Sequence, residues 1–227
     1  MSDAYSDDLA RGIFNGVPIT GELLGNDTSP CWTPNYVYSF RADVTELIFP
    51  QINGDYELTG FASGLTNGSN PWEVNEVPPL IEGASLVIVY HHPTIKPNRM
   101  VMIYDGPPVT FAGAFVNTTI TGFSVGKTVS LKTTFIIADG QSNSAPAQND
   151  QAWLQFPTVQ FLGYTGDGRD VVDSTGTINT VTGWFHDTTT FDLTPYFVRG
   201  MNTATVALKT SSDCLTWLAQ AFSANIN

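Results

Sequence analysis

Two segments near opposite ends of the chain share one local pattern. Residues 41–60 contain an Asp-Val-Thr motif at 43–45, and residues 190–208 contain an Asp-Leu-Thr motif at 192–194. Each segment reads as a short strand, a corner at the motif, about one helical turn, a turn and a new strand. The Asp and Thr side chains can bond nearby backbone groups and hold the corner. Two such corners in a β-rich chain predict a sandwich whose two halves return on each other.

The rest of the chain reads as many short strands. Alternating or apolar runs are separated by turns, 14 Pro and 20 Gly are spread through 227 residues, and no amphipathic helix of three turns appears. We therefore predict one all-β domain, an antiparallel β-sandwich of jelly-roll type, over residues 12–227. Residues 1–11 are predicted to be a flexible leader. Hydrophobic residues make up 42% of the chain, which is enough for a sizeable core.

Individual strands differ in the strength of their signal. Residues 84–90 are nearly all apolar and predict a central strand. Asn15-Gly16 is a favoured type I′ pair and predicts a hairpin over residues 12–24. Residues 215–223 alternate strictly, which predicts a strand with Trp217 in the core. Further strands are predicted over residues 36–42, 55–61, 99–104, 111–123, 128–138, 158–162, 177–185 and 203–209, with residues 105–108 closing the strand that starts at 99.

The charge balance excludes several kinds of partner. Lys and Arg number 9 and Asp and Glu number 21, so the net charge is −12. Nucleic acid and anionic membrane surfaces are not expected as partners of such a chain, because binding to either needs a basic face. No apolar run reaches the roughly 18 residues of a membrane span, so membrane insertion is not expected.

Composition also bears on location. Charged residues are only 13% of the chain, and this low-charge composition is typical of secreted bacterial β proteins. The acidic, polar start of the chain does not resemble a signal peptide. We therefore predict an extracellular or cell-surface module that belongs to a longer surface protein.

Two cysteines, Cys31 and Cys214, lie near opposite ends of the chain. An even pair in a low-charge β chain predicts one disulfide, and the alternative is two buried free thiols. Closing a loop of about 180 residues would stabilise the fold by about 5 kcal/mol in the chain-entropy model. No CxxC motif or Cys/His cluster indicates zinc or redox chemistry.

Acidic residues beside glycines suggest a calcium site. The carboxylates in question are Asp167, Asp170 and Asp173, which share one loop, together with Asp105 and Asp139, which each precede a glycine at a strand end. Carboxylate and backbone oxygens are the ligands that Ca²⁺ prefers. Their spacing does not match an EF-hand, and Asp-Gly pairs are also ordinary turn residues. The sequence therefore predicts Ca²⁺ as a structural ion, with ordinary turns as the alternative.

Four tryptophans are predicted in or beside loops: Trp32, Trp72, Trp153 and Trp184. Exposed aromatic faces there could stack on sugar rings, which predicts a polysaccharide or glycan as ligand. The alternative for each of them is a loop anchor packed on the edge of the sandwich.

No catalytic motif stands out. His186-Asp187 lacks an accompanying nucleophile-elbow sequence, and the glutamates form no distinctive pair. We therefore expect a protein that is not an enzyme.

Several linked motifs resemble a known family. They occupy residues 78–90, 103–106, 139–141, 183–188 and 213–217, in this order. Together they resemble a domain of unknown function found in large secreted or surface-anchored multi-domain proteins of bacteria and some archaea, and the resemblance covers about residues 8–223. It implies an extracellular β-sandwich beside adhesion-type repeats, and it supplies no activity. Separately, the Asp-Val-Thr corners look like those of jelly-roll carbohydrate-binding domains.

These observations predict a non-catalytic extracellular surface module, stabilised by calcium, that binds glycan or mediates adhesion. The alternative is a structural role, as a spacer or as a subunit that contacts other surface-protein subunits in a filament.

Overall fold

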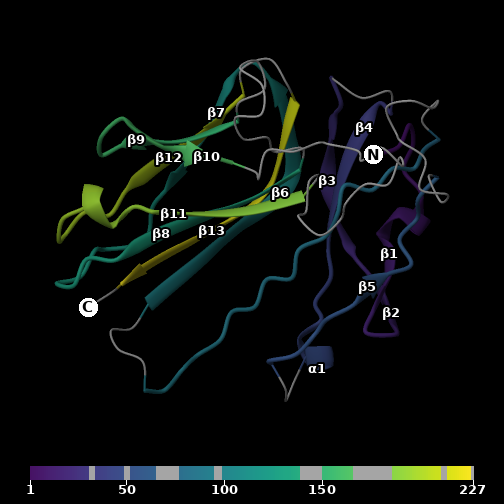
Figure 1. The fold of residues 1–227 in the computed structure, drawn as a ribbon, viewed down its shortest axis with the longest axis horizontal. Coiled ribbons are helices and arrows are strands. Elements are labelled where there is room, and N and C mark those ends of the chain that lie inside the picture. Colours follow the sequence, from purple (N-terminus) through teal and green to yellow (C-terminus); the bar gives the residue numbers. More distant parts are fainter. Residues whose placement is uncertain are drawn as a thin grey trace, which may run out of the picture.

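The chain is mostly antiparallel β-sheet, as predicted. The computed structural model describes residues 1–30, 34–48, 52–64, 77–94, 99–138, 150–165, 186–210 and 214–225. Figure 1 shows a sandwich on the left and the N-terminal strands on the right. Within the described residues, no helix is both long and apolar enough to cross a membrane.

The described strands from Arg99 onward form a sandwich of two four-stranded sheets, with the orders β11-β8-β13-β6 and β10-β9-β12-β7. The strands are β6 (Arg99–Ala112), β7 (Phe115–Ile120), β8 (Leu131–Ala138), β9 (Gln151–Phe156), β10 (Gln160–Tyr164), β11 (His186–Asp192), β12 (Ala204–Lys209) and β13 (Cys214–Asn225). The first strand of the sandwich pairs with the last, and the second with the second-last. This nested order is that of a jelly roll, and it confirms the predicted fold class.

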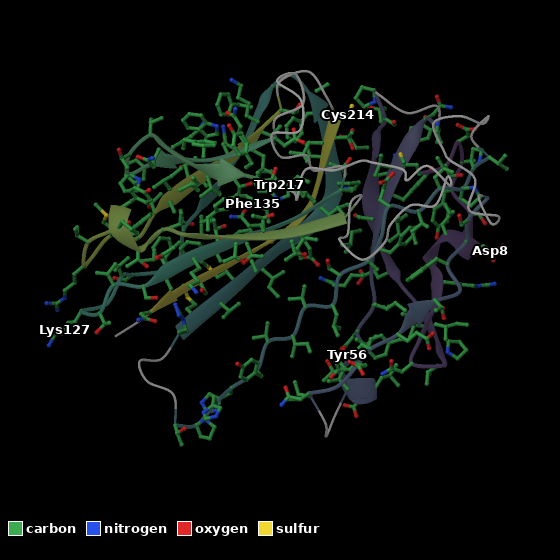
Figure 2. The ribbon with its side chains drawn as sticks, in the orientation of Figure 1. Asp8, Tyr56, Lys127, Phe135, Cys214 and Trp217 are labelled. Atoms are coloured by element: carbon green, nitrogen blue, oxygen red, sulfur yellow. The ribbon has the colours of Figure 1, made fainter. Side chains whose placement is uncertain are left out.

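The core lies between these two sheets. Alternate residues of each strand point inward, for example Leu131, Phe135 and Ile137 of β8, all with no exposed surface. The ring centroids of Phe135 and Trp217 are 5.3 Å apart, and Figure 2 shows both side chains inside the sandwich. Trp217 is only 7% exposed, so its predicted place in the core is confirmed.

The N-terminal strands form two small sheets beside the sandwich. One has the order β2-β1-β5 and the other pairs β3 with β4. Their bounds are β1 (Arg11–Phe14), β2 (Val17–Thr20), β3 (Glu22–Thr28), β4 (Tyr36–Arg41) and β5 (Leu58–Thr59). Asn15 and Gly16 have φ values of 48° and 80°, so the predicted type I′ hairpin joins β1 and β2.

The structure places residues 1–11, predicted as a leader, against these strands. Asp7–Ala10 form a short 3₁₀ helix, and Arg11 begins β1. Ser2 and Tyr36 exchange backbone hydrogen bonds of 3.0 and 3.2 Å.

Three hydrogen bonds join the N-terminal strands to the long strand β6. Arg41 Nη1 donates to Asp105 Oδ2 at 2.7 Å. The hydroxyl of Ser39 donates to the carbonyl of Gly106 at 2.7 Å, and the backbone N–H of Thr110 donates to Asp27 Oδ2 at 2.9 Å. The two bonds to carboxylates, at Asp105 and Asp27, are charge-assisted and therefore stronger than neutral ones, and they help to hold the N-terminal strands against β6.

Both predicted corners are present. The backbone N–H of Thr45 donates to Asp43 Oδ1, and that of Thr194 donates to Asp192 Oδ1, each at 2.9 Å. One helical turn follows in each case, α1 (Thr45–Ile48) and the 3₁₀ helix η3 (Thr194–Tyr196). The prediction that the two corners belong to two halves of one sandwich was wrong. The first corner lies before the sandwich, and only the second connects two of its strands.

The second corner makes stability depend on pH. The hydrogen bond from the Thr194 side chain lowers the pKa of Asp192. A carboxyl whose pKa is lower in the folded state stabilises the protein above its unfolded pKa of about 3.9, and this contribution is lost as pH falls through the folded-state pKa. We expect Asp192→Asn to have a lower free energy of unfolding than the wild type at pH 7. Urea unfolding of both proteins at pH 7 and below pH 3 should show that this difference in free energy becomes smaller in acid. An equal difference at both pH values would contradict this account of the corner.

Residues 84–90 are not the central strand that their apolar run predicts. They are extended but belong to no sheet, and Val87, Val89 and Tyr90 are 45%, 59% and 65% exposed. In Figure 1 this stretch is a blue-green trace below β6. An apolar run indicates that a segment is in contact with other apolar groups, but it does not specify backbone pairing. Here the segment lines a cavity and pairs with no strand of the described residues.

Two other strand predictions need correction. Residues 105–108 do not close a strand, because β6 continues through Pro107 and Pro108 to Ala112. Proline lacks a backbone donor and is tolerated there because β6 is the edge strand of its sheet. Strand β9, where alternate side chains are buried, had been missed altogether.

Candidate ligand-binding face

The outer face of the sheet β10-β9-β12-β7 carries a cluster of aromatic rings. Along β9, Ala152 and Leu154 are fully buried in the core, whereas Gln151 and Trp153 are partly exposed. Because side chains alternate along a strand, Gln151 and Trp153 point to the outer face.

Strand register brings residues far apart in sequence into two rows on this face. The first row crosses the sheet as Phe115, Lys209, Gln151 and Tyr164, and the second as Asn117, Ala207, Trp153 and Phe161. Neighbouring strands are about 4.8 Å apart, so the side chains within each row are adjacent. We call these eight residues the aromatic face.

The rings within the aromatic face touch one another. Trp153 lies between Phe115 and Phe161, with ring centroids 6.2 and 5.2 Å away, and Phe161 is 5.2 Å from Tyr164. Tilted and edge-to-face contacts at these distances are favourable, so each ring fixes its neighbour. Phe115 is still 46% exposed, and therefore the cluster is open to solvent.

Polar groups accompany the rings. The indole Nε1–H of Trp153 donates to Gln151 Oε1 at 3.0 Å, which fixes the orientation of the indole. Asn117 presents an exposed amide from the next strand but one. Ala207 lies between them in the second row, and its small side chain leaves room for the neighbouring rings. The arrangement combines apolar ring faces with amides that can donate and accept hydrogen bonds.

The electrostatics of this sheet differ from those of the chain as a whole. The four strands β7, β9, β10 and β12 contain no Asp or Glu, and Lys209 is their only charged residue. Its Nζ lies 5.1 Å from the ring centroid of Phe115, within cation–π range. A chain of net charge −12 therefore has one sheet free of carboxylates.

Sequence reasoning found only one member of the aromatic face. Trp153 was predicted as a ligand-binding residue in or beside a loop, and the structure places it on strand β9. Trp32, Trp72 and Trp184 lie outside the described residues. Phe115, Phe161 and Tyr164 were not predicted as ligand-binding residues. The alternation in residues 151–156 could have indicated strand β9, but only cross-strand register shows that these three rings lie beside Trp153.

The predicted calcium ligands are mostly outside the described residues. Asp139, Asp167, Asp170 and Asp173 lie there, and Asp105 is paired with Arg41. Within the described residues, no three His, Cys, Asp or Glu side chains gather in a way that could hold a metal ion. The calcium site therefore stays a prediction.

One of the two cysteines of the predicted disulfide also lies outside the described residues. Cys214 begins β13, is fully buried, and is not a free thiol. Figure 2 places it at the end of the sandwich nearest the N-terminal strands. Its predicted partner, Cys31, lies outside the described residues, so the Cys31–Cys214 pairing stays a prediction.

A cavity of about 1090 Å³ lies on the other side of the sandwich. Its walls are the N-terminal strands, residues 80–90, and outward side chains of β6, β8 and β13 such as Ile103 and Ile136. Arg41 on this wall donates to Glu22 and to Asp105, and these bonds raise the pKa of Arg41. Because two carboxylates already neutralise that cation, the aromatic face is the better candidate for ligand recognition.

Comparison with known proteins assigns no family. No protein-family model and no curated protein matches the chain. Among solved structures it is similar to a family GH115 4-O-methyl-α-glucuronidase with specificity for decorated arabinogalactans. That similarity has 13% sequence identity and a TM-score of 0.36, and it covers 67% of this chain and 20% of the other. The chain thus spans about a fifth of that protein, and so distant a likeness assigns no function.

Proposed function

We propose that the protein is a non-catalytic, extracellular carbohydrate-binding module whose aromatic face binds a polysaccharide or glycan. The observation that carries the proposal is the exposed run of touching rings centred on Trp153. A sugar ring has an apolar face of C–H groups and a rim of hydroxyls. An aromatic surface bordered by amides matches both, through dispersion contacts and hydrogen bonds.

The rigidity of the face supports the same proposal. Its rings lie on three strands of one sheet, β7, β9 and β10, and Trp153 is held by Gln151 as well as by its aromatic neighbours. A binding surface that is already ordered loses little conformational entropy when it meets a ligand. The test is binding of the wild-type protein to immobilised neutral and acidic polysaccharides. We expect micromolar to millimolar binding to at least one class, and no binding at high protein concentration would refute the proposal.

A different surface favours the alternative role, a structural subunit that contacts other surface-protein subunits. Val87, Val89 and Tyr90 expose apolar side chains on an extended segment, and β6 is an edge strand of its sheet. Unpaired edges and exposed apolar extended segments promote strand addition between molecules. On this alternative, sedimentation should show concentration-dependent self-association that Val89→Lys weakens. The matched control is Val198→Lys, at a valine 61% exposed in a turn elsewhere. A strictly monomeric wild type would remove this alternative.

A further inference from the structure

Lys209 occupies a distinctive place on the aromatic face. It ends β12, in register with Phe115 on one side and Gln151 on the other. The four residues of its row, one from each strand, thus put a cation between an exposed phenyl ring and an amide, with Tyr164 beyond. A ligand lying across the rings would pass directly over its ammonium group.

This ammonium group is not neutralised by the described part of the protein. The ion pairs of the described residues involve Arg11 and Arg41, and none involves Lys209. The groups that face Lys209 from adjacent strands are an aromatic ring and a neutral amide.

The surroundings make this cation more effective than an ordinary surface lysine. Since β7, β9, β10 and β12 contain no carboxylate, an anion over the aromatic face meets no like charge from the sheet itself. Elsewhere the net charge of −12 repels anions, although salt screens that repulsion beyond about 8 Å at physiological ionic strength. The four strands of this face therefore carry one cation beside aromatic rings and no carboxylate.

Building on the proposed function, we propose that the ligand is an anionic polysaccharide and that Lys209 binds the acidic group of one sugar. The shared chemistry is a singly charged oxyanion on a sugar ring, either the carboxylate of a uronic acid or a sulfate ester. The ring stacks on the aromatic face while the ammonium of Lys209 donates to the oxyanion, a charge-assisted hydrogen bond. A neutral sugar keeps the stacking and loses this bond.

The experiment compares charged and neutral forms of the same polymers. Polygalacturonate is paired with its methyl ester, and dextran sulfate with dextran, in titrations against the wild type, Lys209→Gln and Lys209→Arg. Lys132→Gln is the matched control, because Lys132 is an exposed lysine on the opposite sheet. We expect the wild type to prefer one acidic form about 10-fold, corresponding to about 1.4 kcal/mol. Lys209→Gln should abolish the preference for the acidic form, whereas Lys209→Arg and Lys132→Gln should retain it.

The outcomes separate this inference from the proposed function. A preference for polygalacturonate assigns the carboxylate, and one for dextran sulfate assigns the sulfate. Equal binding of charged and neutral forms, or a preference that survives in Lys209→Gln, would overturn the role of Lys209 and leave carbohydrate binding intact. Failure of the wild type to bind any of the four polymers would count against carbohydrate binding itself, and with it against this inference.

Discussion

Replacing Phe135 by alanine is expected to lower the free energy of unfolding by about 3–5 kcal/mol. Phe135 is fully buried on β8, a central strand, between Trp217 and Phe191, whose ring centroids lie 5.3 and 6.1 Å away. Truncation of this side chain leaves a cavity beside Trp217 and Phe191, and those two side chains cannot fill it without moving. Since domains of this kind are stable by about 5–15 kcal/mol, the loss is a large part of the total. Urea unfolding followed by tryptophan fluorescence measures it.

The matched control for that prediction is Phe115→Ala. Phe115 is the same residue type on the opposite sheet, but it is 46% exposed and points outward. We expect this variant to lose about 1 kcal/mol or less, as is usual for exposed positions. Similar losses for both variants would mean that the core does not lie between the two sheets as described.

Replacing Trp153 by alanine is expected to weaken glycan binding about 30-fold, or about 2 kcal/mol, with little change in fold. Trp153 contacts both neighbouring rings, so its removal takes away the centre of the aromatic face and leaves Phe115 and Phe161 separated. It is only partly buried and lies outside the core cluster, so the midpoint of thermal unfolding should shift by only a few degrees. Calorimetric titration of both proteins with one glycan measures the effect.

Trp153→Phe is the companion variant. Phenylalanine keeps an aromatic ring but loses the Nε1–H that donates to Gln151, so its affinity should fall between those of the wild type and Trp153→Ala. Unchanged affinity in Trp153→Ala, with the fold intact, would move the binding site away from this sheet.

The corners and the hairpin could be predicted from sequence because local bonds hold them. Asp43 and Asp192 each bond an N–H two residues ahead, and Asn15-Gly16 needs only the positive φ values that these two residues allow. The jelly-roll fold class also followed from short strands and frequent turns. The prediction of a central strand over residues 84–90 was wrong, because an apolar run does not specify which strand it will pair with.

The candidate site could not be predicted from the sequence for a related reason. Its aromatic rings come from three strands, and only cross-strand register places Phe115, Trp153 and Phe161 together. Trp153 was predicted from its residue type and its place beside a polar loop, and the structure shows that it lies on a strand. Lys209 gave no signal, because an unpaired cation is recognised only when its neighbours are known.

The central claim, that glycan binds at Trp153, is tested most directly by NMR of the indole N–H groups during a titration with a bound polysaccharide fragment. The chain has 5 tryptophans, and the signal of Trp153 is identified by its absence from Trp153→Phe. The account predicts that this signal shifts progressively with ligand while that of Trp217, buried beside Phe135, stays in place. A stationary Trp153 signal under conditions where the fragment binds would contradict it.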